Sequence, residues 1–165
     1  MDLQPLLQPS SRHQTRRRAS TVRRSAPVRI LTICLGNICR SPMAGGLLRE
    51  RLRREGRLGE VRTAGLSDHS GRPPVNHAVQ AMREIGIDIG DDYSKPLTAA
   101  LVDWADVIVP AEEWHAHQVF SRHPEAAPKL RRLAHDITDP YGRDLDVYRK
   151  TRDHLRQLID GLALE

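Results

Sequence analysis

The sequence predicts an α/β fold in which helices cover both faces of a parallel sheet. Short runs of β-branched and apolar residues alternate along the chain with longer segments whose apolar residues recur at helical spacing. Strands that alternate with helices form parallel sheets, because each helix carries the chain back to the start of the next strand. The length of 165 residues suits one domain with a core of its own.

Four segments have the character of buried strands. The first, Val-Arg-Ile-Leu-Thr-Ile over residues 28–33, is β-branched and mostly apolar, which is typical of a strand inside a parallel sheet. Three further strands are expected over residues 60–64, 106–109 and 129–134. Pro110 ends the third, because proline cannot donate to the ladder of a central strand.

Helices are expected between these strands and after the last. Pro42 suits the first turn of a helix, whose apolar stripe consists of Leu47, Leu48, Leu52 and Leu58. Gly45 and Gly46 weaken this helix by about 1 kcal/mol each, and they allow it to pack closely against the sheet. Further helices are predicted over residues 74–85, where Gly86 stops the helix, and over residues 111–120 and 144–162.

The positive charge of the chain is confined to one end. The formal net charge is +5, and residues 1–27 account for all of it with six Arg and one Asp. Their composition predicts a disordered basic tail before a folded domain over residues 28–165. The tail resembles an organellar transit peptide, and a flexible terminus or an upstream start codon are the alternatives. We expect neither nucleic-acid binding nor a membrane span, because the domain itself is charge-balanced and lacks a long apolar stretch.

One stretch of the sequence has the residue types of an anion-binding catalytic loop. It reads Cys-Leu-Gly-Asn-Ile-Cys-Arg-Ser-Pro over residues 34–42, between the first strand and the first helix. A loop at this position aims backbone N–H groups at an anion, and the helix N-terminus adds positive potential. Gly36 and Asn37 tolerate the backbone conformations that such a loop needs, and Arg40 offers a fork that matches two oxyanion oxygens. Cys34 lies on the floor of this cradle, where a thiolate is stabilised, and Ser41 can donate a hydrogen bond to it.

The cysteines have two other interpretations. They could be ordinary buried apolar residues, or half of a zinc site. The chain has only two Cys, so it lacks the thiol ligands to complete such a site, and we expect no metal. Two cysteines five residues apart also make a disulfide framework implausible and indicate a reducing cytoplasm.

The loop resembles the active-site loop of the low molecular weight protein tyrosine phosphatases. Their motif has the same order of Cys, Gly-Asn, a second Cys and Arg-Ser-Pro near the start of the domain. The resemblance extends over residues 28–162 and includes an Ala-Gly after the second strand and a late Asp-Pro-Tyr-Gly over residues 139–142. It implies a phosphotyrosine protein phosphatase I-like fold: three α/β/α layers with four strands in the order 2-1-3-4.

The resemblance also assigns roles to residues. Cys34 is the nucleophile, Arg40 holds the phosphoryl oxygens, and Asp139 is the general acid for the leaving oxygen. On its sequence alone Asp139 belongs to an ordinary exposed turn, and Asp136 is a second candidate for the acid. The loop residues expected to hold phosphate are Leu35, Gly36, Asn37, Ile38, Cys39 and Ser41. Tyr141 matches an aromatic wall, and His69 is the one aromatic candidate for the opposite wall.

These residues predict a protein-tyrosine phosphatase that uses a phosphocysteine intermediate and no cofactor. Its partner would be a phosphotyrosine protein or a small aryl phosphate, and we expect a monomer or weak dimer. A protein-arginine phosphatase and a non-catalytic phosphopeptide-binding module are the alternatives. Ile38 favours an aryl phosphate over phosphoarginine as the substrate, because relatives that act on phosphoarginine carry Thr at this position. Arsenate reductases share the loop but need a third cysteine, which this chain lacks. A reversible disulfide between Cys34 and Cys39 is a further hypothesis.

Overall fold

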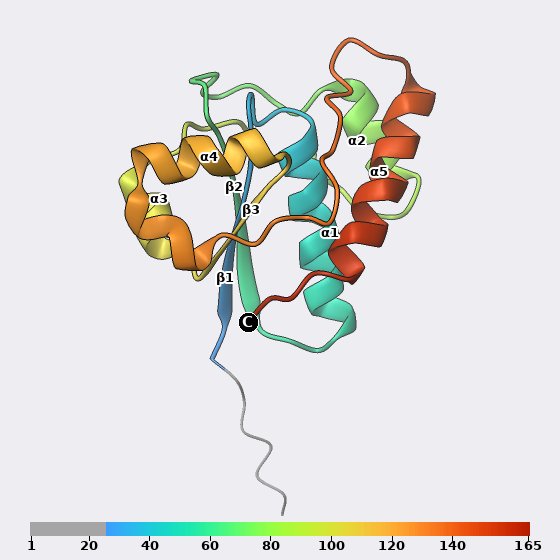
Figure 1. The fold of residues 1–165 in the computed structure, drawn as a ribbon. Helices are drawn as coiled ribbons and strands as arrows, with labels where there is room; N and C mark the ends of the chain where they lie inside the picture. Colours follow the sequence, from blue (N-terminus) through green and yellow to red (C-terminus); the bar gives the residue numbers. More distant parts are fainter. Residues whose placement is uncertain (1–25) are drawn as a thin grey trace, which may run out of the picture.

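A three-stranded parallel sheet forms the centre of the computed structural model, which describes residues 26–165 (Figure 1). Its strands β1 (Val28–Cys34), β2 (Gly59–Gly65) and β3 (Val107–Pro110) lie in the order β2-β1-β3. Val28 pairs with Gly59 of β2, and Ile30 pairs with Val107 of β3. The central strand is therefore the one that leads into the Cys34 loop.

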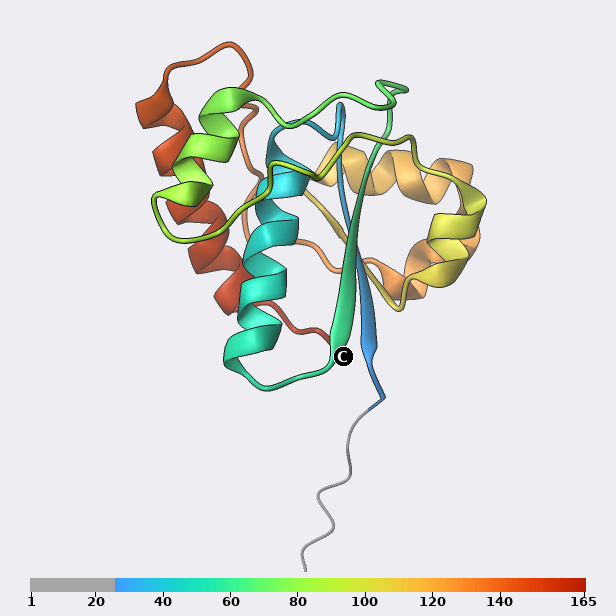
Figure 2. The same cartoon turned by 180° about the vertical axis from the view of Figure 1, so that it is seen from behind.

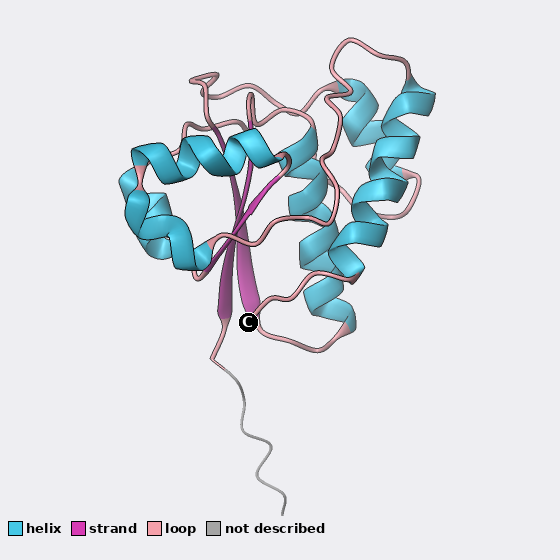
Figure 3. Ribbon diagram, in the orientation of Figure 1, coloured by secondary structure: helices cyan, strands magenta, loops and turns pink. Residues whose placement is uncertain are grey.

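Helices cover both faces of the sheet, as Figures 1 and 2 show from opposite sides. On one face lie α1 (Arg40–Arg54), α2 (Asn76–Arg83) and α5 (Leu145–Asp160); on the other lie α3 (Ala99–Trp104), α4 (Glu113–Arg122) and the 3-10 helix η1 (Pro124–Lys129). Figure 3 shows the same three layers coloured by element. The predicted α/β architecture is confirmed.

Alternate residues of β1 build the two halves of the core. Ile30 packs with the cluster under α1, α2 and α5, whereas Leu31 and Ile33 pack with the cluster under α3 and α4. All three side chains are fully buried. This period of two, with apolar residues on both faces, is the reason that β1 is mostly apolar and does not alternate between apolar and polar residues.

The predicted fourth strand is present only in part. Leu130 forms a single parallel bridge with Ile108, and the Arg131 N–H donates to the Ile108 carbonyl at 2.8 Å. Residues 132–136 then leave the sheet edge, and the chain returns when the Ile137 N–H donates to Ala111. The segment thus lies beside β3, the place that the order 2-1-3-4 gives it, without forming a strand in the described chain.

The first helix packs as closely as its glycines predict. A Cβ on Gly45 would lie 2.8 Å from Thr63 of β2, and one on Gly46 would lie 2.8 Å from Ile89. The prediction for Leu58 was wrong: α1 ends at Arg54, Gly56 has a left-handed φ of 60°, and Leu58 is 57% exposed. The helix stops before the fourth leucine because glycine takes this backbone conformation without strain.

The other helices are shifted or shorter than predicted. Pro74 precedes α2 rather than starting it, and Gly86, with a φ of 78°, follows the turn after α2. Asp144 caps α5 through its side chain, which accepts from the Val147 N–H at 3.1 Å. The sequence pattern missed α3, whose six residues are too few to show a helical period. The sequence feature that marks the start of α3 is Thr98, which caps the helix by accepting a hydrogen bond from the Leu101 N–H.

The sequence also predicted a disordered basic tail and no membrane span. The predicted tail lies outside the described residues, apart from residues 26 and 27. Among the residues that the structure describes, no helix has the length and apolarity needed to cross a membrane.

Candidate active site

The loop between β1 and α1 curls around the sulfur of Cys34. Asn37 is its one non-glycine residue with a left-handed backbone, at a φ of 56°. This conformation lets the Asn37 N–H donate to Cys34 Sγ at 3.2 Å. Ser41 Oγ, in the first turn of α1, lies 3.1 Å from the same sulfur. The sulfur of Cys34 therefore lies at the N-terminus of α1, in contact with a backbone N–H and a hydroxyl.

Asn37 also braces the loop from behind. Its side chain is fully buried: Nδ2 donates to Ser41 Oγ at 2.8 Å, and Oδ1 accepts from the Lys95 N–H at 3.0 Å. Thr32 in β1 donates to the Ser41 carbonyl at 2.8 Å. The loop is thus tied to the strand before it, to the helix after it and to the distant segment at Lys95.

Arg40 is buried at the start of α1 and is only 3% exposed. Its Nη1 donates to the Ile137 carbonyl at 2.8 Å and pairs with the Glu112 carboxylate. Its Nε has no hydrogen-bond partner within residues 26–165. Leaving such a donor buried and unpaired costs about 1–3 kcal/mol, so it indicates a ligand. The Nε and Nη2 edge of the guanidinium is the fork that an oxyanion can accept from.

Glu112, which orients Arg40, was not found by sequence reasoning. It caps α4, and its carboxylate accepts hydrogen bonds from Trp114 Nε1 as well as from Arg40. His115 completes the cap, because its Nδ1 accepts from the Glu112 N–H at 3.0 Å. Burial lowers the pKa of His115 to about 4, and the charge of Arg40 acts in the same direction. The sequence signal that could have identified Glu112 was its position just after β3, because ligands bind at the carboxyl edge of such a sheet.

The Asp-Pro-Tyr-Gly turn brings Asp139 over the loop. Asp139 Oδ2 lies 3.6 Å from Arg40 Nη2, and Oδ1 accepts from the Tyr141 N–H at 3.1 Å. The carboxylate is half exposed at the pocket wall, where a leaving group would enter. Asp136, the second candidate for the acid, instead accepts from the Glu113 N–H at 2.8 Å at the start of α4. Of the two candidates, Asp139 is therefore the one that lines the pocket.

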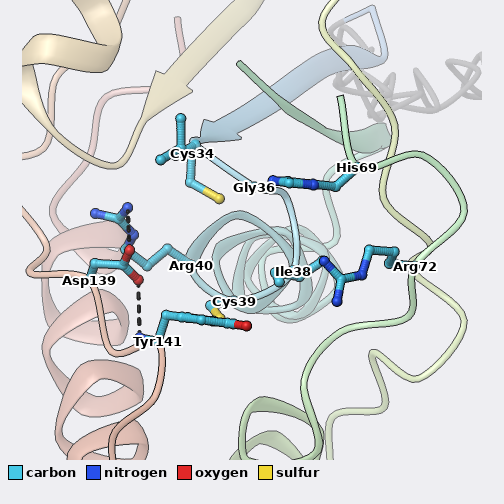
Figure 4. A pocket seen from close by; sticks show the side chains of 10 residues that line it. Cys34, Gly36, Ile38, Cys39, Arg40, His69, Arg72, Asp139 and Tyr141 are labelled. Atoms are coloured by element: carbon cyan, nitrogen blue, oxygen red, sulfur yellow. Dashed lines mark hydrogen bonds and ion pairs between the residues drawn. The ribbon is translucent and has the colours of Figure 1, made fainter. Parts of the chain in front are cut away.

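These residues enclose a pocket of about 330 Å³ (Figure 4). Most of the residues predicted for the site line it, namely Cys34, Leu35, Gly36, Ile38, Cys39, Arg40, His69, Asp139 and Tyr141. Asn37 and Ser41 do not line it but lie behind the loop as braces. Figure 4 shows His69 and Tyr141 on opposite sides of the pocket, as the two predicted walls require. Arg72, which also lines the pocket, was missed because nothing in its local sequence sets it apart.

The second cysteine of the loop has a different environment. Cys39 and Cys34 are both free thiols, but Cys39 Sγ lies 3.4 Å from the buried hydroxyl of Tyr148. Burial raises the pKa of the Cys39 thiol to about 11, against the lowering effect of its hydrogen bond with Tyr148. Cys39 is therefore protonated at neutral pH, and the disulfide between the two cysteines stays a prediction.

Several known proteins are similar to this chain in sequence and fold. The family model described as low molecular weight phosphotyrosine protein phosphatase matches residues 29–165. A protein-arginine-phosphatase of Geobacillus stearothermophilus is 38% identical, over 83% of this chain and 95% of its own length. The crystal structure of a low molecular weight protein tyrosine phosphatase from T. tengcongensis superposes with a TM-score of 0.77 at 36% identity, covering 81% of this chain and 95% of that one. Arsenate reductase 1 of Bacillus cereus is 32% identical, over 81% of this chain and 92% of its own length.

Proposed function

The chain belongs to the low molecular weight phosphotyrosine protein phosphatase family, and we propose that it hydrolyses phosphotyrosine through a phosphocysteine intermediate. The observation that carries the proposal is that Cys34 and Arg40 line one pocket, and that the Nε of Arg40 has no hydrogen-bond partner among residues 26–165. A cysteine sulfur and a guanidinium, both at the N-terminus of α1, match a phosphoryl group and its oxygens.

In the first step Cys34 Sγ attacks phosphorus. The sulfur–phosphorus bond forms while the bond from phosphorus to the phenolic oxygen breaks. The Nε and Nη2 of Arg40 and the loop N–H groups hold the phosphoryl oxygens, over which the charge of the transition state is spread. Asp139 gives its proton to the departing phenolic oxygen, which a half-exposed carboxyl at the pocket wall can reach.

In the second step water hydrolyses the phosphocysteine. Asp139, now ionised, takes a proton from the water as its oxygen attacks phosphorus, and the Cys34 thiolate leaves. The Ser41 hydroxyl, 3.1 Å from the sulfur, and the Asn37 N–H stabilise the departing thiolate. The products are inorganic phosphate and the regenerated enzyme.

The pocket supports an aryl substrate. Ile38 and Tyr141 present apolar and aromatic surface to the space above Cys34, and an aromatic ring gains more from such walls than a guanidinium does. Phosphoarginine is the second candidate, because the Geobacillus relative carries that activity in its name. Arsenate reduction is disfavoured, because it needs a third cysteine and the chain has two.

We propose that residues 28–165 carry this activity as a monomer or weak dimer in the cytoplasm. The substrate would be a phosphotyrosine protein or a small aryl phosphate. Two thiols without a disulfide framework suit a reducing compartment, and the charge balance of residues 28–165 gives no reason to expect a nucleic-acid partner.

A kinetic comparison of matched phosphopeptides tests the proposal. Two peptides of one sequence would carry phosphotyrosine or phosphoarginine, and phosphate release would give kcat/KM for each. We expect phosphotyrosine to be preferred by about tenfold or more. Ile38→Thr should reduce that preference. A preference for phosphoarginine would transfer the assignment to the second candidate, and binding without turnover of either peptide would make the domain a phosphopeptide-binding module.

A further inference from the structure

Arg72 places a positive charge at the mouth of the pocket. It lines the pocket and is exposed to solvent. Within the described part of the chain its guanidinium makes no ion pair and no hydrogen bond, in contrast to Arg40, whose Nη1 is fixed by Glu112 and Ile137. The charge of Arg72 is therefore available to a ligand.

The backbone that carries Arg72 is firmly held. Ser94 is buried and its N–H donates to the Arg72 carbonyl at 2.8 Å, while its hydroxyl accepts from the Arg72 N–H at 3.0 Å. The Gly71 N–H donates to the Ser94 carbonyl, and the Ser94 hydroxyl donates to the carbonyl of His69. Since Lys95, next to Ser94, also braces Asn37, the Arg72 loop and the Cys34 loop are anchored to one segment. The backbone position of Arg72 relative to the pocket is thus fixed by the fold.

Arg72 lies on the wrong side of the pocket to be a second ligand for the phosphoryl group. Figure 4 shows its side chain beyond Ile38, on the side away from Asp139 and Arg40. The buried donors that face the phosphoryl position come from Arg40 and the loop. The charge of Arg72 therefore faces the parts of a substrate that surround the phosphate-bearing side chain.

We propose that Arg72 selects phosphotyrosine residues that are flanked by acidic residues. The inference rests on the proposed function, and it adds the substrate class. A carboxylate beside the phosphotyrosine would pair with the Arg72 guanidinium as the phosphate enters the loop. The same charge disfavours basic flanking residues and cationic groups at the pocket mouth.

Three phosphotyrosine peptides of one length would test this, with acidic, neutral or basic residues on both sides of the phosphotyrosine. For the wild type we expect kcat/KM in the order acidic, neutral, basic. Because exposed ion pairs are weak, the ratio of acidic to neutral should be about two- to fivefold and should fall as salt is added. Arg72→Gln should bring this ratio close to one, and Arg72→Glu should invert it.

A ratio within one variant does not depend on how much of that variant is folded, so partial misfolding cannot imitate the result. Arg156→Gln is the matched control, because it removes the charge of an exposed arginine on α5 that does not line the pocket. It should keep the wild-type ratio. Equal hydrolysis of the three peptides by the wild type, or an unchanged ratio in Arg72→Gln, would overturn the role of Arg72 alone. No hydrolysis of any of them would overturn the proposed function instead.

Discussion

The floor and the rim of the pocket are built differently. The floor comprises Cys34 and Arg40, which line the pocket, and the braces Asn37 and Ser41, which lie behind the loop. All four are buried, and each has a hydrogen-bond partner inside the protein. The rim consists of Leu35, His69, Arg72 and Tyr141, which are all exposed. Tyr141 is 59% exposed and Leu35 is 41% exposed.

This difference separates chemistry from selection. Buried polar groups in a connected network hold their geometry, and preorganised geometry is what phosphoryl transfer requires. Exposed side chains on a rim lose little when one is exchanged, so they can be adapted to a substrate. We therefore expect floor substitutions to act on kcat, and rim substitutions to act on KM and on the choice of substrate.

The largest effect is expected from Cys34→Ser. A serine hydroxyl is far less acidic than a thiol, so the nucleophile is lost, and turnover of an aryl phosphate should fall by about 10⁴-fold or more. Binding of a phosphate analogue, measured by calorimetry, should persist because the loop donors remain. Cys39→Ser removes the other thiol of the same loop and should lose far less activity. Retained turnover in Cys34→Ser would refute the nucleophile assignment.

Asp139→Ala should slow hydrolysis by roughly 10²–10⁴-fold, because the leaving oxygen then departs unprotonated. The loss should be smaller for p-nitrophenyl phosphate than for phenyl phosphate, since an acidic phenol needs less protonation. Steady-state kinetics with both esters measure this.

Asp136→Ala provides the comparison for that experiment. Asp136 accepts a hydrogen bond from the N-terminus of α4, so its loss should affect stability more than rate. A larger loss of rate in Asp136→Ala than in Asp139→Ala would assign the acid to Asp136.

The two parts of the pocket also differ in how well the sequence predicts them. The floor can be predicted because its residues are contiguous: Cys34 to Ser41 form one loop whose chemistry depends on local order. Glu112 and Arg72 were missed, because they reach the site only through β3 and the Ser94 contacts. The fold shows the same limit, since long periodic elements such as α5 were predicted while the six-residue α3 was missed. The sheet edge at Leu130 depends on packing against β3. Such a contact between distant segments leaves no pattern in the local sequence.

A smaller effect should follow from removing the brace at Asn37. Asn37→Gly loses two buried hydrogen bonds and keeps the left-handed backbone, which should lower the free energy of unfolding by about 1–3 kcal/mol. Asn37→Ala should cost about 1 kcal/mol more, because alanine is strained at a φ of 56°. Urea unfolding measures both, and kcat should fall in parallel as the loop loosens. A glycine variant as stable as the wild type would show that the brace is not needed.

The smallest effect is expected at the rim, from Tyr141→Ala. The ring offers a stacking surface worth about 0.5–1.5 kcal/mol, so KM for an aryl phosphate should rise by roughly two- to tenfold while kcat changes less. Tyr141→Phe keeps the ring and should retain most of the affinity. An alkyl phosphate cannot stack, so the advantage of the aryl over the alkyl ester should shrink in Tyr141→Ala. Because alanine keeps the backbone N–H that contacts Asp139, a fall in kcat at constant KM would mean that the ring itself contributes to the chemical step, and the division between floor and rim would fail at this residue.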